Sequence, residues 1–119
     1  MKFERQRYIL FYYIIEKDLT IDGKSIINLI WNNLFRYFGV KETSKIGLWL
    51  VKFNLEERWG ILRFAHTSKE IVITSLGMIR YFQNSRISIY PIKTSGTIKK
   101  LRKILKNFHL EKNASLKYE

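Results

Sequence analysis

The sequence has no cysteine, one proline and six glycines in 119 residues. The absence of cysteine excludes disulfide scaffolds, thiolate metal sites and cysteine nucleophiles. No Pro/Gly-rich linker divides the chain, and its length fits one compact domain. No window approaches about 18 consecutive apolar residues, so we expect no transmembrane helix. The apolar stretch 8–15 lacks the small-residue cleavage site of a secretory signal, which makes a cytoplasmic protein the expectation.

Acidic residues are also scarce: 10 Asp and Glu face 22 Lys and Arg, which gives a net charge of +12. Residues 93–119 carry half of that excess in less than a third of the chain, and no acid lies between Lys93 and Leu110. Such a run can be no more than a solvated helix face, but charges of one sign repel each other without a partner. Nucleic acid is the leading candidate, and an anionic membrane surface or an acidic protein is the alternative.

The few carboxylates are scattered, which disfavours an enzyme. A metal-dependent nuclease needs several acids around one or two ions, and here only Glu56 and Glu57 are adjacent, in an expected turn. His66 and His109 are expected at the surface or its boundary, and neither a Walker loop nor a nucleophile elbow is present. We therefore expect no catalytic residue and no bound metal or cofactor, with a nuclease of dispersed carboxylates as an alternative.

The first half of the chain predicts a strand, a helix and a hairpin. Residues 7–15 are β-branched and aromatic on both faces, as in a strand buried on both sides. Asp18 to Gly23 is rich in turn residues. The helix that follows is indicated by helical spacing of apolar residues and closes at Gly39, with these apolar positions: Ile27, Ile30, Trp31, Leu34 and Phe38. Residues 46–53 and 59–65 predict two strands joined by a hairpin connection.

The second half predicts a helix, a strand and a basic helix. Residues 70–76 have strand propensity, but Thr67 and Glu70 have capping-box spacing, which favours a helix that extends to Phe82. Residues 86–92 alternate as a strand, with Pro91 at its end or on an exposed edge. The last helix has an apolar stripe: Ile98, Leu101, Ile104, Leu105 and Phe108.

This order of elements predicts an α+β fold. It matches a ferredoxin-like (RRM-like) βαββαβ sandwich with an added C-terminal basic helix. The stripe of that last helix would pack either on the open face of the sheet or on a partner protein. We expect residues 1–110 to form a single domain and residues 111–119 to form a frayed polar tail.

The start of the last helix is a candidate phosphate site. Thr94 and Ser95 are good N-cap residues, and Gly96 would let a partner approach the backbone. Free N–H groups and the helix dipole attract anions there, yet Lys99 and Lys100 occupy the first turn, where Asp or Glu is usual. A bound phosphate would reverse that unfavourable term. The alternative is that this small penalty is simply tolerated.

Aromatic residues on the predicted strands suggest a second mode of binding. RRM domains stack unpaired bases on aromatic residues of a βαββαβ sheet, and four residues could act in this way: Tyr8, Tyr12, Trp59 and Phe64. The sequence 57–61 fits the consensus of those strands poorly, so a core or a partner-facing position is the favoured interpretation.

Four blocks resemble the family of protein component 2 of archaeal ribonuclease P, whose eukaryotic relatives serve in ribonuclease P and ribonuclease MRP. They are residues 7–9 (RYI), 48–53 (LWLVKF), 60–63 (GILR) and 94–101 (TSGTIKKL). They have the family's order and comparable spacing over residues 5–108. The chain departs from the family in its short N-terminal segment and in Lys93, where many members have an apolar residue or Gly.

The resemblance implies an accessory subunit of the enzyme that removes 5′ leaders from precursor tRNA, with an RNA subunit as catalyst and Mg²⁺ held by that RNA. It implies a larger TIM-barrel-like protein partner and self-association into a 2:2 assembly, whereas a stand-alone RRM-like module acting on other structured RNA is the alternative. The candidate RNA-binding residues are Arg7, Arg63, Lys93, Ser95, Gly96, Thr97, Lys99, Lys100, Arg102 and Lys103.

Overall fold

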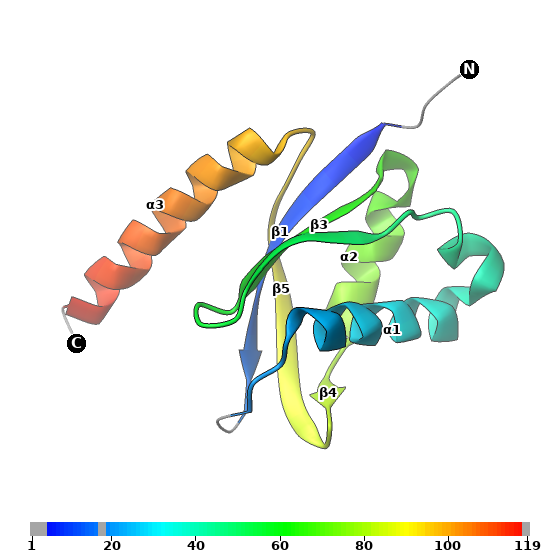
Figure 1. The fold of residues 1–119 in the computed structure, drawn as a ribbon, viewed down its shortest axis with the longest axis horizontal. Helices are drawn as coiled ribbons and strands as arrows, with labels where there is room; N and C mark the ends of the chain where they lie inside the picture. The colour runs from blue at the N-terminus through cyan, green and yellow to red at the C-terminus, as the bar shows by residue number, and fades with distance from the viewer. Residues whose placement is uncertain (1–4, 17–18, 118–119) are drawn as a thin grey trace.

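The computed structural model describes the backbone of residues 5–16 and 19–117, and the side chains of residues 5–16 and 19–107. Its strands form one antiparallel sheet in the order β2-β3-β1-β5-β4 (Figure 1). The strands are β1 (Gln6–Ile15), β2 (Trp49–Asn54), β3 (Trp59–Ala65), β4 (Tyr81–Phe82) and β5 (Ser85–Ser95). The helices are α1 (Gly23–Thr43), α2 (Lys69–Met78) and α3 (Ile98–Lys117), with a 3-10 turn, η1 (His66–Ser68), before α2.

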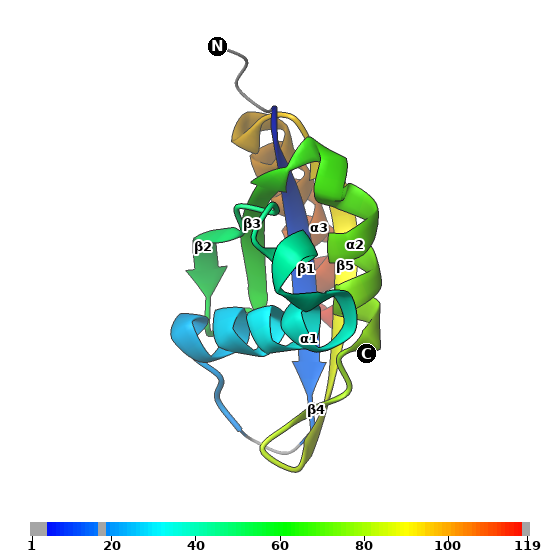
Figure 2. The same ribbon diagram turned by 90° about the vertical axis from the view of Figure 1, so that its right-hand side faces the viewer.

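The α+β class is confirmed. Helices α1 and α2 lie on one face of the sheet and α3 lies on the other, with the central strand β1 between them (Figure 2). Apart from the two-residue strand β4, the strand order and the antiparallel pairing are consistent with the predicted ferredoxin-like arrangement.

The main core lies between the sheet and the pair α1 and α2. Alternate residues of β1 point to this side, because successive side chains of a strand face opposite ways. Ile9 and Phe11 are fully buried there, as are Ile30 and Leu34 of the predicted helix face. The observed face is centred one residue earlier than predicted: Ile26 is fully buried, whereas Ile27 is only partly buried.

A smaller core lies between the sheet and α3. Leu10 of β1, Ile61 of β3 and Leu101 of α3 are fully buried in it, with partly buried apolar side chains around them. The prediction that the first strand is buried on both faces is therefore confirmed. The stripe of the last helix packs on the open face of the sheet, and its final member, Phe108, lies outside the described side chains.

Two strands differ from their predicted bounds. β2 begins at Trp49 rather than residue 46, because the chain turns at Gly47, which has a φ of 61°. β5 continues through Pro91 to Ser95. Proline is tolerated at this position because a β-bulge interrupts the pairing of β5 with β1 between Leu10 and Phe11.

The residues around α2 also depart from prediction. The segment 70–76 is helical as favoured, but the capping box is wrong: Thr67 lies in η1, and the N-cap residue, Ser68, makes no side-chain capping bond. α2 ends at Met78 rather than near Phe82, because Gln83 and Asn84 both have positive φ and form the two-residue turn of a hairpin between β4 and β5.

The helix ends agree more closely with the sequence. Gly39 has a φ of 79° and interrupts α1 where the helix was predicted to close, but one further turn follows it to Thr43. α3 gives helical backbone to residues 111–117, part of the expected tail; fraying of that tail stays a prediction. None of the described helices is both long and apolar enough to cross a membrane.

Candidate nucleic-acid interface

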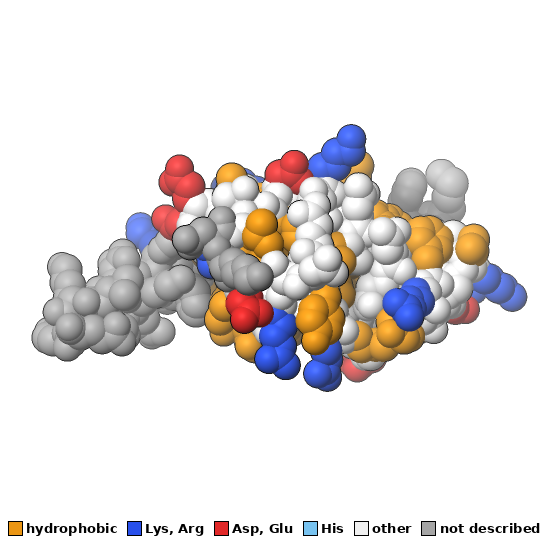
Figure 3. Space-filling model, turned by 90° about the horizontal axis from the view of Figure 1, so that it is seen from below, with side chains coloured by type: hydrophobic (Ala, Val, Ile, Leu, Met, Phe, Trp, Pro, Cys, Tyr) orange, Lys and Arg blue, Asp and Glu red, His pale blue; other side chains and the backbone are white. Residues whose placement is uncertain are grey.

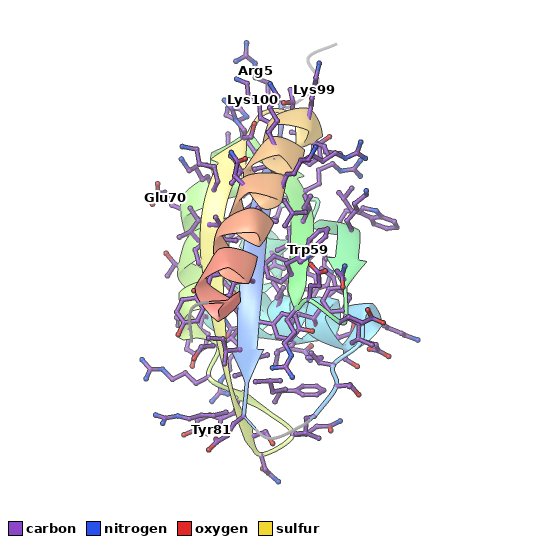
Figure 4. The ribbon with its side chains drawn as sticks, turned by 90° about the vertical axis from the view of Figure 1, so that its left-hand side faces the viewer. Arg5, Trp59, Glu70, Tyr81, Lys99 and Lys100 are labelled. Carbon is purple, nitrogen blue, oxygen red and sulfur yellow. The ribbon has the colours of Figure 1, made fainter. Side chains whose placement is uncertain are left out.

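Basic side chains gather at the end of the sheet where β1 begins and β5 ends. Tyr8 of β1 pairs with Ser95 of β5, and both α2 and α3 begin at this end (Figure 1). Arg5, Lys99 and Lys100 all lie at this end of the fold (Figure 4). We call this region the basic end and define it by Arg5, Arg7, Lys69, Lys93, Lys99 and Lys100.

The first turn of α3 is capped by hydroxyl groups. Thr97, rather than the predicted Thr94 or Ser95, is in the capping position: its Oγ1 accepts a hydrogen bond from the N–H of Lys100 at 3.4 Å. Ser95 Oγ accepts from the N–H of Thr97 at 3.2 Å. Of the four N–H groups that a helix start leaves without intrahelical acceptors, those of Thr97 and Lys100 have these hydroxyl acceptors.

Gly96 has a role that the sequence did not predict. A Cβ atom at this position would lie 2.9 Å from Nη1 of Arg7, so the guanidinium of Arg7 lies over the glycine. The space above Gly96 is therefore filled by a side chain of this same chain. Gly96 thus lets the guanidinium of Arg7 reach the end of β5, and the approach of a partner to the backbone of Gly96 stays a prediction.

Next to Arg7 is a depression of about 410 Å³ on the α2 side of the sheet. It is lined by Arg7, His66, Lys69, Thr94 and Ser95. His66, Lys69 and Thr94 were not among the predicted binding residues. Lys69 and Thr94 are far apart in the chain, and only the strand order places the start of α2 beside the end of β5. The sequence did predict an exposed or boundary position for His66, and the structure confirms that His66 is exposed.

The other candidate residues are divided between two places. Lys93, Arg102 and Lys103 are exposed, the last two on the second turn of α3. Arg63 lies on β3, on the same face as α3, and pairs across the sheet with Tyr8 and Trp49. Its Nε atom is buried without a hydrogen-bond partner in the described residues, so Arg63 lies beside α3 and away from the depression.

The aromatic residues do not form an open stacking surface. Phe64 is fully buried in the main core, so it cannot stack on a base. Tyr8 and Trp59 pack in the smaller core against residues of α3. Tyr12 stacks on Tyr90, with ring centroids 4.9 Å apart. The positions of Phe64, Tyr8 and Trp59 agree with the core part of the favoured interpretation, and Tyr12 lies outside both cores.

The described residues hold no cluster of three or more metal-binding side chains. The two displaced pKa values have structural causes. The pKa of Asp22 is lowered first by a hydrogen bond from the side chain of Ser25 and then by one from the N–H of Ser25, 2.8 Å from the carboxylate, at the start of α1. The pKa of Tyr13 is raised by burial in the main core. Neither residue lies at the basic end.

The opposite end of the sheet has mixed charge. Figure 3, which views the end where β4 lies, shows Asp and Glu side chains near Lys and Arg and between hydrophobic patches. Glu16 follows β1, Asp22 precedes α1, and Glu56 and Glu57 lie in the connection between β2 and β3; all four are exposed. The positive charge is therefore concentrated at one end of the fold.

Comparisons with known proteins agree with this arrangement. A family model described as the Rpp14/Pop5 family matches residues 7–106. Ribonuclease P protein component 2 of Methanococcus aeolicus is 36% identical over 107 residues, which cover 89% of this chain and 76% of that protein. The protein of the same name from Pyrococcus furiosus is 35% identical over 106 residues, covering 88% and 87%.

A solved structure shares the fold. A chain in the cryo-EM structure of yeast ribonuclease MRP matches with a TM-score of 0.66 at 12% identity, and the match covers 96% of this chain and 98% of that one. The family resemblance seen in the sequence is confirmed by the family model and by the archaeal relatives. The chain belongs to the Rpp14/Pop5 family.

Proposed function

We propose that this chain is a protein subunit of ribonuclease P, which binds the catalytic domain of the RNA subunit and supports removal of 5′ leaders from precursor tRNA. The names of its relatives support the complex. The observation that carries the RNA-binding role is the basic end, where two helices begin and exposed Lys and Arg side chains gather. Phosphate is the ligand that this combination favours.

The chain itself supplies no catalytic group in this proposal. The RNA subunit performs the cleavage and holds the Mg²⁺ ions, and the protein binds no cofactor. Phosphates that approach one another in a compact RNA fold repel, and Lys99, Lys100 and Arg102 would reduce that repulsion by displacing counterions. The protein would thereby lower the Mg²⁺ concentration at which the folded RNA is stable.

Partner proteins complete the proposal. We place this chain in the cytoplasm, with a larger TIM-barrel-like subunit and with self-association into a 2:2 assembly. Exposed apolar side chains support protein contacts: Phe35, Tyr37 and Val40 on the last turns of α1 are 43%, 51% and 72% exposed. Groups of exposed apolar residues commonly mark interaction surfaces.

Reconstitution with the cognate RNA subunit and the barrel partner tests the proposal. We expect leader cleavage of precursor tRNA at low Mg²⁺ only when this protein and its partner are present. Equal cleavage with and without them would refute the proposed function. The purified chain alone should cleave no precursor tRNA, and robust cleavage free of RNA contamination would contradict the non-catalytic role.

A further inference from the structure

We infer that the depression between β1, η1, α2 and β5 is a phosphate-binding pocket for the RNA backbone. This inference rests on the proposed function and adds a contact on the α2 side of the sheet, away from the exposed surface of α3. The pocket is lined by Arg7, His66, Lys69, Thr94 and Ser95. The residues come from three separate parts of the chain and meet only in the folded structure.

The chemistry of the lining suits a phosphate. Arg7 and Lys69 carry positive charge, and Thr94 and Ser95 add hydroxyl donors. None of the described residues that line the pocket is acidic, and no salt bridge joins Arg7 or Lys69 to a carboxylate in the described part of the chain. Glu70 follows Lys69 but is exposed and does not line the pocket (Figure 4).

Strand register places Arg7 over Gly96. In the antiparallel register, Tyr8 pairs with Ser95, which sets Arg7 opposite Gly96. Because Gly96 has no Cβ, the guanidinium of Arg7 can lie against the end of β5 beside Thr94 and Ser95. Arg7 is also only half exposed, so its fork of donors is positioned before a ligand arrives.

Ser95 connects the pocket to the start of α3. Its side chain lines the pocket, and its Oγ accepts the hydrogen bond from the N–H of Thr97. The first turn of α3, which begins at Ile98, follows directly, and a helix start attracts anions. One RNA strand that crosses the basic end would therefore place one phosphate in the pocket and another at the start of α3.

The test measures how the affinity for the ribonuclease P RNA transcript depends on salt. The slope of log affinity against log salt is negative, and each lost phosphate contact reduces its magnitude by about 0.7 to 0.9. We expect Arg7→Gln and Lys69→Gln each to make the slope less steep by this amount. Arg86→Gln is the matched control, because Arg86 is exposed at the far end of β5, roughly 30 Å from Ser95.

Gly96→Ala tests the position of Arg7 at constant charge. The new methyl group displaces the guanidinium, so we expect weaker RNA binding with no change in net charge and little change in melting temperature. Gly77→Ala is its control: Gly77 is on α2 with nothing within 4 Å of the added atom, and RNA binding should not change.

Three outcomes would overturn the pocket. In the first, the salt slope is unchanged for Arg7→Gln and for Lys69→Gln but is less steep for Lys99→Gln, which would place all phosphate contacts on α3. An equal loss for Arg86→Gln would indicate diffuse charge without a pocket. An unchanged slope together with weaker binding of the barrel subunit would assign the pocket to an acidic protein surface. Failure of the proposed function differs from these, since the unsubstituted chain would then not support leader cleavage.

Discussion

The two faces of the sheet bury very different amounts of apolar side chain: we call the face covered by α1 and α2 the deep face and the face covered by α3 the shallow face. On the α1 and α2 face, buried side chains from three strands (β1, β3 and β5), two helices and the adjoining loops form one continuous core. On the other face, three buried residues, Leu10, Ile61 and Leu101, join α3 to the sheet, with partly buried residues at their margin. Helix α3 diverges from the sheet toward its C-terminal end (Figure 1).

Buried apolar side chains and charged side chains at the surface therefore have different roles, and the charged ones lie both on α3 and at the rim of the α2 side, where Arg7 and Lys69 line the pocket. The deep face supplies most of the apolar burial that stabilises the fold. The shallow face holds a helix whose exposed side is basic: Lys99, Lys100, Arg102 and Lys103 are all exposed. Substitutions in the first region should therefore unfold the protein, and substitutions of the charges should weaken its binding to RNA without unfolding it.

The largest expected effect is that of Leu34→Ala on the deep face. Leu34 is fully buried in the main core, so the substitution removes apolar contacts and leaves a cavity. We expect the free energy of unfolding to fall by about 2 to 5 kcal/mol. Chemical denaturation measures this change in the free energy of unfolding. A smaller loss for Leu34→Ala than for Leu101→Ala would reverse the comparison of the two faces.

Leu101→Ala should have a smaller effect on global stability. Leu101 is also fully buried, but its neighbours in the shallow core can relax as α3 shifts. We expect a loss of about 2 kcal/mol, at the low end for such substitutions. Hydrogen exchange should accelerate in α3 before it accelerates in β1, because α3 can open locally. Equal acceleration in both elements would show that α3 belongs to the main cooperative unit.

Asp22→Ala should have the smallest effect, and the effect should depend on pH. The pKa of Asp22 is lowered in the folded state by its hydrogen bonds with Ser25. The carboxylate therefore stabilises α1 above the pKa of an unfolded Asp, about 3.9, and this contribution is lost as pH falls through the lowered folded value. The melting temperature of the variant should be lower by a few degrees at pH 7.

The difference in melting temperature between Asp22→Ala and the unsubstituted chain should narrow below pH 4. Asp22→Asn is the control, because an amide oxygen can still accept the hydrogen bond from Ser25 but does not titrate in this range. A difference between Asp22→Ala and the unsubstituted chain that stays constant down to pH 2 would contradict the titration of this cap.

The sequence predicted those parts of the fold that depend on periodicity. The apolar spacing from Ile30 to Leu34 and the double-sided burial of β1 are properties of single segments, and both are confirmed. The predictions differ from the structure at positions where tertiary structure, and not the local sequence pattern, determines the conformation. The capping box at Thr67 did not form because the chain passes through η1 first. Pro91 lies within β5 rather than at its end, on the exposed edge that was the other predicted position, because β4 pairs only with Ser85 and Arg86.

The candidate site was only partly predictable for a related reason. Lys99 and Lys100 stand in an uninterrupted basic segment, so composition selected them. Lys69 stands beside an acid in a weakly charged part of the sequence, and its place next to Thr94 follows from the strand order. The position of Arg7 over Gly96 depends on strand register, which no local pattern of charge encodes.

The most direct measurement is the RNA affinity of a variant with four substitutions at the basic end: Arg7→Gln, Lys69→Gln, Lys99→Gln and Lys100→Gln. We predict a melting temperature close to that of the unsubstituted chain, together with a salt slope whose magnitude is smaller by about 3. Unchanged RNA affinity and slope in a folded variant would contradict the claim that the fold and the RNA contacts reside in separate regions of this molecule.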